Sequence, residues 1–80
     1  MRKQAYSILV YNNPGLLSRM AGLFSRRGYN IESITAGTTA DPRFTRITIV
    51  ASGDEQILSQ IEKQVRKMED VIEVKPLNDS

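Results

Sequence analysis

One short segment is best suited to chemistry that uses backbone amides, Asn12-Asn13-Pro14-Gly15-Leu16-Leu17. The alternation of apolar residues along 4–11 stops there, and helical spacing of apolar residues begins. Asn13 is favoured as a helix N-cap, and Pro14 is favoured at the first helical position. First-turn amides lack partners inside a helix and lie at the positive end of its dipole, so they can bind a carboxylate or a phosphate. We expect the free amides to be those of Gly15, Leu16 and Leu17.

The local pattern leaves two interpretations of this segment open. An ordinary strand-to-helix turn, whose amides are satisfied by an asparagine side chain and water, is the more frequent outcome. An anion site is the sharper interpretation, because Gly15 has no side chain to block a ligand. A free amino acid would place its carboxylate on the amides and its ammonium on a side-chain oxygen of Asn12 or Asn30. Its apolar side chain could rest against Leu16 or Ile31.

Other kinds of chemistry find little support in the composition. The 80 residues include no cysteine and no histidine, so thiolate chemistry and the commonest general base are missing. Ser18, Ser25 and Ser52 have no histidine to activate them, and no clustered carboxylates or phosphate-binding glycine motif is present. We therefore expect no catalytic residue, no metal site and no cofactor in this chain. The absence of a long apolar run predicts a cytoplasmic protein that is not bound to membranes.

Apolar periodicity predicts six elements in the order β-α-β-β-α-β. The strands are expected at 4–11, 31–39, 44–51 and 71–77, and the helices at 14–27 and from Ser52 or Asp54 to Met68. Ser52 with Glu55 fits a capping box, and Asp54 is the alternative cap. The inward residues are expected to be Tyr6, Ile8, Val10, Leu17, Met20, Ala21, Phe24, Ile34, Ala36, Ile47, Ile49, Ile57, Leu58, Ile61, Val65, Met68, Ile72 and Val74.

This order is typical of the α+β ferredoxin-like fold, a four-stranded antiparallel sheet with two helices on one face. We expect one domain over 1–78 and a polar tail at 79–80. Right-handed crossovers put the first strand beside the third and leave the second and fourth strands at the edges, the fourth with Pro76. The second strand carries little charge apart from Glu32, so its edge invites pairing with a second copy. Such pairing would bring Asn30 and Ile31 of one chain towards Asn13-Pro14-Gly15 of the other.

Two alternatives, one for the role of Asn30 and one for the function of the domain, stay open. Asn30 taken alone is equally well explained as a residue that tolerates left-handed backbone after Gly28. Ferredoxin-like domains also bind RNA by stacking bases on strand aromatics, but only Tyr11 and Phe44 are candidates and both fall near strand ends. The formal net charge is only +2, with both signs mixed along the chain, so RNA binding stays a lower-ranked alternative.

Several runs of residues resemble a known family. The stretch from Asn13 to Arg19, NPGLLSR, resembles the opening of the first helix in ACT domains, small-molecule regulatory modules of amino-acid metabolism. The run GLFSRRGYNIESI at 22–34 is similar to the signature of the acetolactate synthase small subunit, and TRITIV at 45–50 and QIEKQ at 60–64 continue the likeness. The resemblance covers nearly the whole chain.

The resemblance implies a non-catalytic regulatory subunit of branched-chain amino-acid biosynthesis, including that of valine and isoleucine. Its partner would be the large catalytic subunit, which uses thiamine diphosphate, Mg and FAD. The small subunit activates that partner and confers feedback inhibition by valine, which is bound between two ACT domains. Carried over by position, the valine site is Asn12, Asn13, Pro14, Gly15, Leu16 and Leu17 of one chain with Asn30 and Ile31 of the other.

The sequence departs from the family in two respects. Most members carry a second domain after the ACT domain, whereas this sequence stops at Ser80, as that of a naturally short member or of an excised fragment would. The alternative function is that of a short subunit that activates the catalytic subunit without sensing an amino acid. Asn13-Pro14 follows the general ACT pattern, whereas small subunits commonly have acidic or serine residues here, which could shift the ligand preference.

Overall fold

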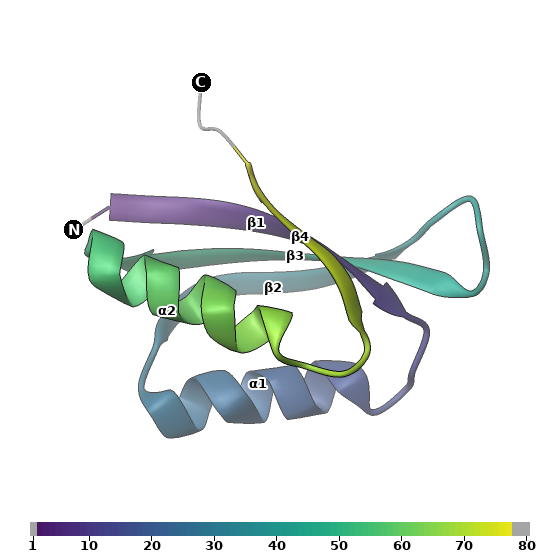
Figure 1. Cartoon of the computed structure of the whole chain (residues 1–80), viewed down its shortest axis with the longest axis horizontal. Helices are drawn as coiled ribbons and strands as arrows, with labels where there is room; N and C mark the ends of the chain where they lie inside the picture. Colours follow the sequence, from purple (N-terminus) through teal and green to yellow (C-terminus); the bar gives the residue numbers. More distant parts are fainter. Residues whose placement is uncertain (1, 78–80) are drawn as a thin grey trace.

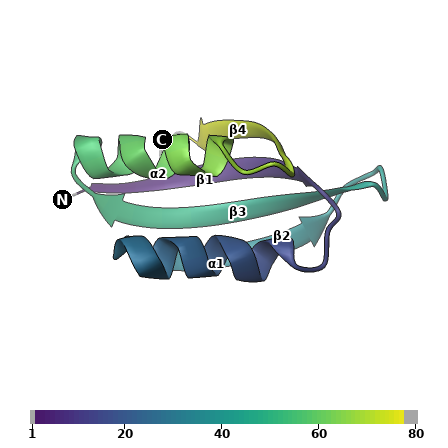
Figure 2. The same cartoon turned by 60° about the horizontal axis from the view of Figure 1, so that its bottom comes forward.

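Four strands and two helices follow one another in the predicted order in the computed structural model, which describes residues 2–77 (Figure 1). They are β1 (Arg2–Tyr11), α1 (Leu16–Arg27), β2 (Asn30–Thr38), β3 (Phe44–Gly53), α2 (Glu55–Arg66) and β4 (Val71–Leu77). The strands form one antiparallel sheet in the order β2-β3-β1-β4, and both helices cover the same face of it (Figure 2). The predicted fold class and the two edge strands are therefore confirmed. The predicted domain limits at residues 1, 78 and 79–80 lie outside the described residues.

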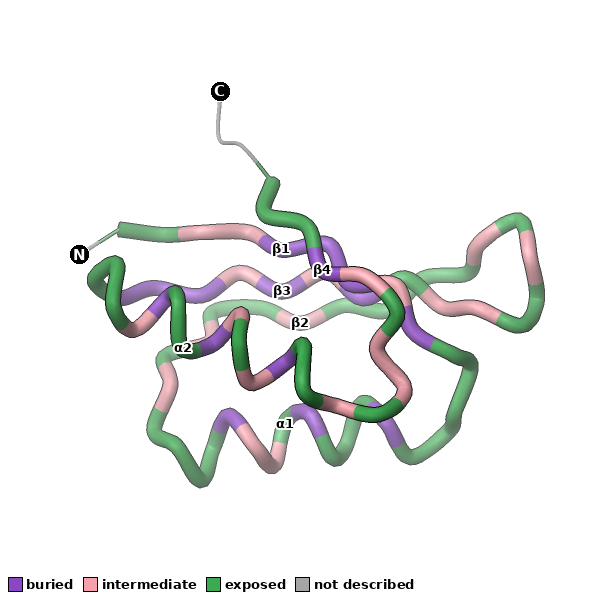
Figure 3. Tube along the Cα trace, in the orientation of Figure 1, coloured by how far each residue is buried: buried purple, intermediate pink, exposed green. Residues whose placement is uncertain are grey.

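The core lies between the sheet and the two helices (Figure 3). β1 contributes Tyr6, Ile8 and Val10 to it and β3 contributes Ile47 and Ile49, as predicted, and all five are at most 3% exposed. The remaining buried apolar residues are Leu16, Met20, Phe24, Ala51, Leu58, Ile61, Val65 and Val74. These buried residues come from every element except the edge strand β2, whose half-buried Ile31 and Ile34 pack against them. The core therefore fixes both helices against the sheet.

Helix α1 begins later and is rotated relative to the prediction. Its first residue is Leu16, and Gly15 occupies the N-cap position without a side-chain cap, so the N-cap role predicted for Asn13 is wrong. The buried row is Leu16, Met20 and Phe24, at helical spacing of four. Leu17 and Ala21, predicted to face inward, are exposed because they lie on the neighbouring row of the helix.

Helix α2 begins with a complete cap. Asp54 is the N-cap, and its Oδ1 accepts a hydrogen bond of 2.8 Å from the Ile57 amide. The capping box predicted for Ser52 is therefore wrong, and the alternative cap is confirmed. Ser52 instead belongs to β3, where its hydroxyl bonds side chains of β2.

A β-bulge in each edge strand changes which residues face the core. In β2 the register shifts at Glu32, so Ile31 pairs with Ala51 and Ile34 pairs with Ile49, and both isoleucines face the helices. Without the bulge, residues three apart in a strand would lie on opposite faces. Ala36 shares the helical face by register but is exposed, because an edge strand has a neighbour on one side only.

The second bulge overturns one further prediction. In β4, Val71 pairs with Val10 whereas Glu73 pairs with Leu9, so Ile72 is the extra residue. Val71 consequently packs against the core, and Ile72 is 44% exposed rather than inward. Val74, two residues on, is buried as predicted.

Candidate functional site

The β1–α1 loop, residues 12–15, is held from both sides by its neighbours. The Asn12 amide donates to the Arg43 carbonyl at 2.8 Å, and Thr45 Oγ1 donates to Asn12 Oδ1 at 3.3 Å, so Asn12 is fixed to the β2–β3 connection. Asn12, Asn13, Pro14 and Gly15 are all exposed, and Pro14 and Gly15 form a turn. The four residues are therefore exposed to solvent, and Asn12 holds the loop against the β2–β3 connection.

The first-turn amides are only partly available. The Gly15 amide donates to Asn13 Oδ1 at 3.1 Å, and the Leu16 amide donates to the Asn13 carbonyl at 3.0 Å. Two of the three amides predicted to be free are thus already bonded. Among residues 2–77, no acceptor is found for the amides of Leu17 and Ser18. These two donors, at the positive end of the α1 dipole, are the ones left for an anion.

The two leucines of the predicted site have different surroundings. Leu16 is 2% exposed and packs in the core, so its side chain cannot contact a ligand at the surface. Leu17 is 37% exposed beside the loop. The side chain of Leu16 therefore positions the loop, and that of Leu17 is accessible.

Asp70 is a residue of the site that sequence analysis missed. It lies in the turn after α2, and its Oδ2 accepts hydrogen bonds from Asn13 Nδ2 at 3.1 Å and from Arg19 Nη2 at 2.6 Å. Its carbonyl also accepts from the Tyr11 amide at 3.0 Å. No local pattern could have revealed it, because 57 positions separate Asn13 from Asp70.

Asn30 and Ile31 lie at the other end of α1, at the start of β2 (Figure 2). The Asn30 Nδ2 donates to Ser52 Oγ at 3.0 Å, and that hydroxyl donates to Glu32 Oε2 at 2.9 Å. The hydrogen bond from Ser52, followed by one from Lys3, holds the pKa of Glu32 below its usual value. With its amide nitrogen engaged, Asn30 keeps its side-chain oxygen as an acceptor.

A groove of about 380 Å³ lies beside Asn30, between α1 and β2. We call it the β2 groove. Ile31 is half-buried within it, and the other lining residues are Ala21, Phe24, Ser25, Tyr29 and Ile34. A mainly apolar lining beside a polar acceptor suits a small molecule with an apolar side chain and an ammonium group.

The structure therefore divides the eight predicted site residues into two groups. Six lie at the start of α1, and two lie past its end, with the 12-residue helix between them. At 1.5 Å per residue the helix is about 18 Å long, so one small ligand cannot touch both groups in a single chain. A second copy is required to complete a site that uses both.

Other candidate sites are few within the described part of the chain. No group of three or more acidic residues there could hold a metal ion, and no helix in it is long and apolar enough to cross a membrane. Tyr11 and Phe44 lie 5.6 Å apart between ring centroids at one end of β1 and β3, with the Arg43 guanidinium 5.2 Å from the Phe44 ring.

Comparisons with known proteins point in one direction. A family model described as "AHAS small subunit-like ACT domain" matches residues 6–73. The chain is 52% identical over 75 residues to the acetolactate synthase isozyme 3 small subunit of Escherichia coli K12, covering 94% of this chain and 46% of that protein. It is 54% identical over 71 residues to the probable acetolactate synthase small subunit of Methanothermobacter thermautotrophicus, covering 89% and 42%. The chain spans less than half the length of these two relatives.

Solved structures agree with the sequence relatives. The crystal structure of the acetolactate synthase small subunit from Thermotoga maritima is similar with a TM-score of 0.88 and 42% identity, over 98% of this chain and 48% of that one. The ACT domain from the GTP pyrophosphokinase of Chlorobium tepidum has a TM-score of 0.75 but only 17% identity, over 94% of this chain and 96% of that one, so it shares the fold alone.

Proposed function

The chain belongs to the AHAS small subunit-like family of ACT domains, and from this premise we propose that it is a non-catalytic regulatory part of acetolactate synthase. In this proposal, valine or a related branched-chain amino acid binds between two copies paired along β2. Binding changes how the chain acts on the catalytic large subunit, which would itself carry thiamine diphosphate, Mg and FAD. The observation that carries the proposal is the incompletely capped start of α1, where an anion can replace the missing cap.

The site residues support an amino acid as the ligand. Its carboxylate would accept hydrogen bonds from the amides of Leu17 and Ser18. Its ammonium would donate to the Asn30 side-chain oxygen of the second copy, which the Ser52 hydroxyl leaves available. Its apolar side chain would enter the β2 groove beside Ile31. Each functional group of the ligand thus has a partner of matching chemistry.

The exposed edge of β2 supports the pairing. Among the described strands, β2 bonds to β3 alone, so the other side of this nine-residue strand presents unpaired backbone groups. Antiparallel pairing of β2 with its copy is two-fold symmetric, so the β1–α1 loop of each chain would lie beside the β2 groove of the other. Ligand binding would then depend on the geometry of the pair, which is the requirement for coupling to a partner.

Calorimetric titration with valine tests this proposal, with Gly15→Asp as the disrupting variant. Gly15 has an ordinary φ of −87°, and an added Cβ would meet only Asn13 Oδ1 at 3.8 Å, so the fold tolerates the change. The new carboxylate would repel that of the ligand and should weaken binding by about 100-fold or more, since like charges in contact cost several kcal/mol. Gly22→Asp makes the same chemical change at mid-helix, where a Cβ also has room, and should leave the affinity unchanged.

The outcomes separate the two readings of the chain. Saturable binding by the parent and by Gly22→Asp, with none by a folded Gly15→Asp, supports an amino-acid sensor with its site at the loop. Absence of heat from the parent at millimolar valine would remove the sensing role. The alternative would then be a subunit that activates the catalytic subunit without binding an amino acid, which an activity assay of the mixed subunits measures directly.

A further inference from the structure

A second groove, of about 390 Å³, lies between α1 and α2. We call it the helix groove. Its lining includes three basic residues, Arg19, Arg26 and Lys67, and the apolar Leu23 and Met68. Within the described residues, no carboxylate lines it, and α1 contains no acidic residue in its whole length. The groove is therefore positive as well as partly apolar.

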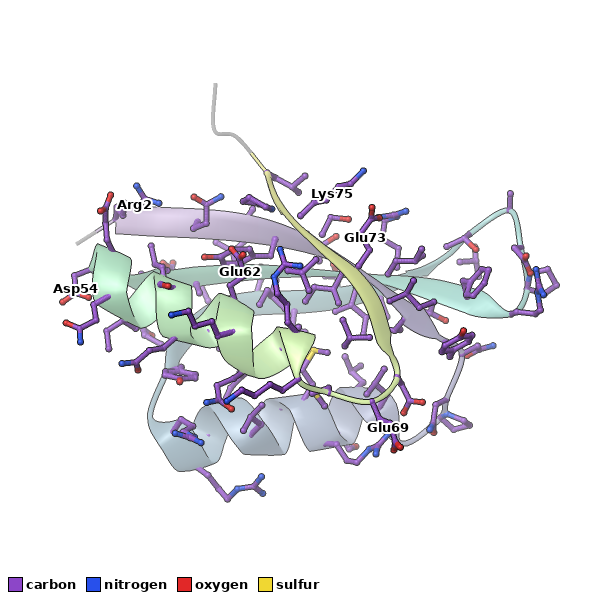
Figure 4. The ribbon with its side chains drawn as sticks, viewed as in Figure 1. Arg2, Asp54, Glu62, Glu69, Glu73 and Lys75 are labelled. Atoms are coloured by element: carbon purple, nitrogen blue, oxygen red, sulfur yellow. The ribbon has the colours of Figure 1, made fainter. Side chains whose placement is uncertain are left out.

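Two of its three basic groups have no ion pair. Arg19 is bound to Asp70 at 2.6 Å, whereas within residues 2–77 Arg26 and Lys67 make no salt bridge. Glu69 follows in the turn after α2 but does not line the groove (Figure 4). Two cations without an ion pair in the lining of one groove favour an anionic partner there.

The apolar lining says what kind of anion fits. Leu23 and Met68 are half-buried, and Gly22 in the same lining adds no side chain of its own. The Arg26 guanidinium lies over Gly22, 3.7 Å from the position that a Cβ there would take. Of the α1 residues that line the groove, Ser18 alone has an amide without an acceptor among residues 2–77, whereas the amides of the others are bonded along the helix. One free amide does not make the cluster of backbone donors that holds a phosphate. In the part of the chain that the structure describes, no aromatic residue lines the groove for stacking on a base. A protein segment with apolar and acidic side chains matches the groove better than a nucleic acid or a free phosphate.

We propose that the helix groove docks an acidic, amphipathic segment of the acetolactate synthase catalytic subunit. This inference rests on the proposed function and assigns its contact surface. Arg26 and Lys67 would pair with carboxylates of the segment, and Leu23 and Met68 would receive its apolar side chains.

The groove is also connected to the proposed amino-acid site. Arg19 lines the groove and binds Asp70, and the same carboxylate oxygen of Asp70 accepts from Asn13 in the β1–α1 loop. A shift of the loop on ligand binding would therefore reach the groove through one shared oxygen atom. Docking and amino-acid binding would influence one another reciprocally.

Binding of the parent chain and of two matched double variants to the catalytic subunit of the same organism tests the proposal. Arg26→Glu with Lys67→Glu reverses both unpaired groove charges and should weaken binding about tenfold or more, and flatten its salt dependence. Arg27→Glu with Lys63→Glu makes the same charge change outside the groove, in the last turns of α1 and α2, whereas Lys67 is the C-cap of α2. Arg27 and Lys63 are exposed and make no salt bridge within 2–77. Both variants place acidic residues near helix C-termini, so their effects on stability should match.

Three results are possible, and each decides the matter. Weakened binding by the groove variant alone supports the docking surface. Equal binding by all three proteins, or equal weakening of both variants, overturns the groove while leaving the proposed function intact. Failure of the parent chain to bind the catalytic subunit overturns both.

Discussion

The two helices of this chain lie side by side on one sheet but begin in different ways. At the start of α2, the Asp54 side chain caps the Ile57 amide, and Glu55 in the first turn complements the helix dipole. At the start of α1, Gly15 supplies no side-chain cap and the first turn has no acidic residue. The chain itself caps the start of α2 with a side chain but leaves the start of α1 incompletely capped.

The difference shows what stabilises each helix start. α2 is fixed by capping and by the Tyr6 hydroxyl, which donates to the Leu58 carbonyl at 3.1 Å inside the core. α1 is fixed at its start by the burial of Leu16 and by the bonds of Asn13 to Gly15 and Asp70. Because packing and not capping holds α1, its amides can stay open without loss of the helix.

The largest expected effect comes from removing that packing. Leu16→Ala should lower the free energy of unfolding by about 2–5 kcal/mol, because it leaves a cavity in the core beneath the loop. Leu17→Ala, one residue along and exposed, should cost less than about 1 kcal/mol. Urea unfolding of the two variants measures both values. Equal costs would mean that burial of Leu16 does not anchor α1.

Removing the caps should give a smaller and unequal pair of effects. Asp54→Ala should cost about 1 kcal/mol and lower Tm by about 4–8 °C, because it strips the cap from α2. Asn13→Ala breaks two exposed hydrogen bonds and should cost about half as much or less, while weakening valine binding. Thermal unfolding followed by circular dichroism compares them. A larger loss of Tm for Asn13→Ala than for Asp54→Ala would mean that the start of α1 depends more on its side-chain hydrogen bonds than the start of α2 does.

The Tyr6 hydroxyl, which bonds α2 to the sheet, should make part of the stability of the fold depend on pH. Burial, followed by the nearby charge of Glu62, raises the pKa of Tyr6 above its ordinary value of 10.0. The folded state therefore holds this proton more tightly than the unfolded state. The contribution of the protonated Tyr6 hydroxyl to the free energy of unfolding is complete below pH 10.0 and is lost as pH rises above it. Tyr6→Phe should cost about 1 kcal/mol at neutral pH and should remove this part of the alkaline loss. Urea unfolding of both proteins at neutral and alkaline pH is the measurement, and parallel stability curves would contradict the assignment.

Most of the fold could be predicted because it depends on local patterns. Alternation placed β1 and β3 with the correct inward faces, since both are central strands with a core on one side. The wrong inward assignment in β4, Ile72, falls where one residue is inserted into the strand. Those in α1, Leu17 and Ala21, come from a rotation of the helix. Nothing in the sequence marks Glu32 or Ile72 as a bulge, because a bulge depends on the partner strand's register and not on the residue itself.

The candidate site was predictable in part for the same reason. Gly15 and Asn30 were identified by residue type and by resemblance, both of which can be read along the chain. Ser52 and Asp70 act through contacts across long sequence separations, so only the folded chain brings them to Asn30 and Asn13. Ser52 was instead assigned to a cap, which Asp54 two residues later provides.

Pro76 makes the two edges of the sheet unequal in their capacity to pair with another chain. Of the two sheet edges, β2 offers backbone groups along its length, whereas β4 carries Pro76, which has no N–H, between charged Lys75 and exposed Leu77. Growth by edge pairing can therefore use one side only. Two copies joined along β2 would leave only β4 edges outside, so such an assembly would stop at two chains rather than extend into a fibre.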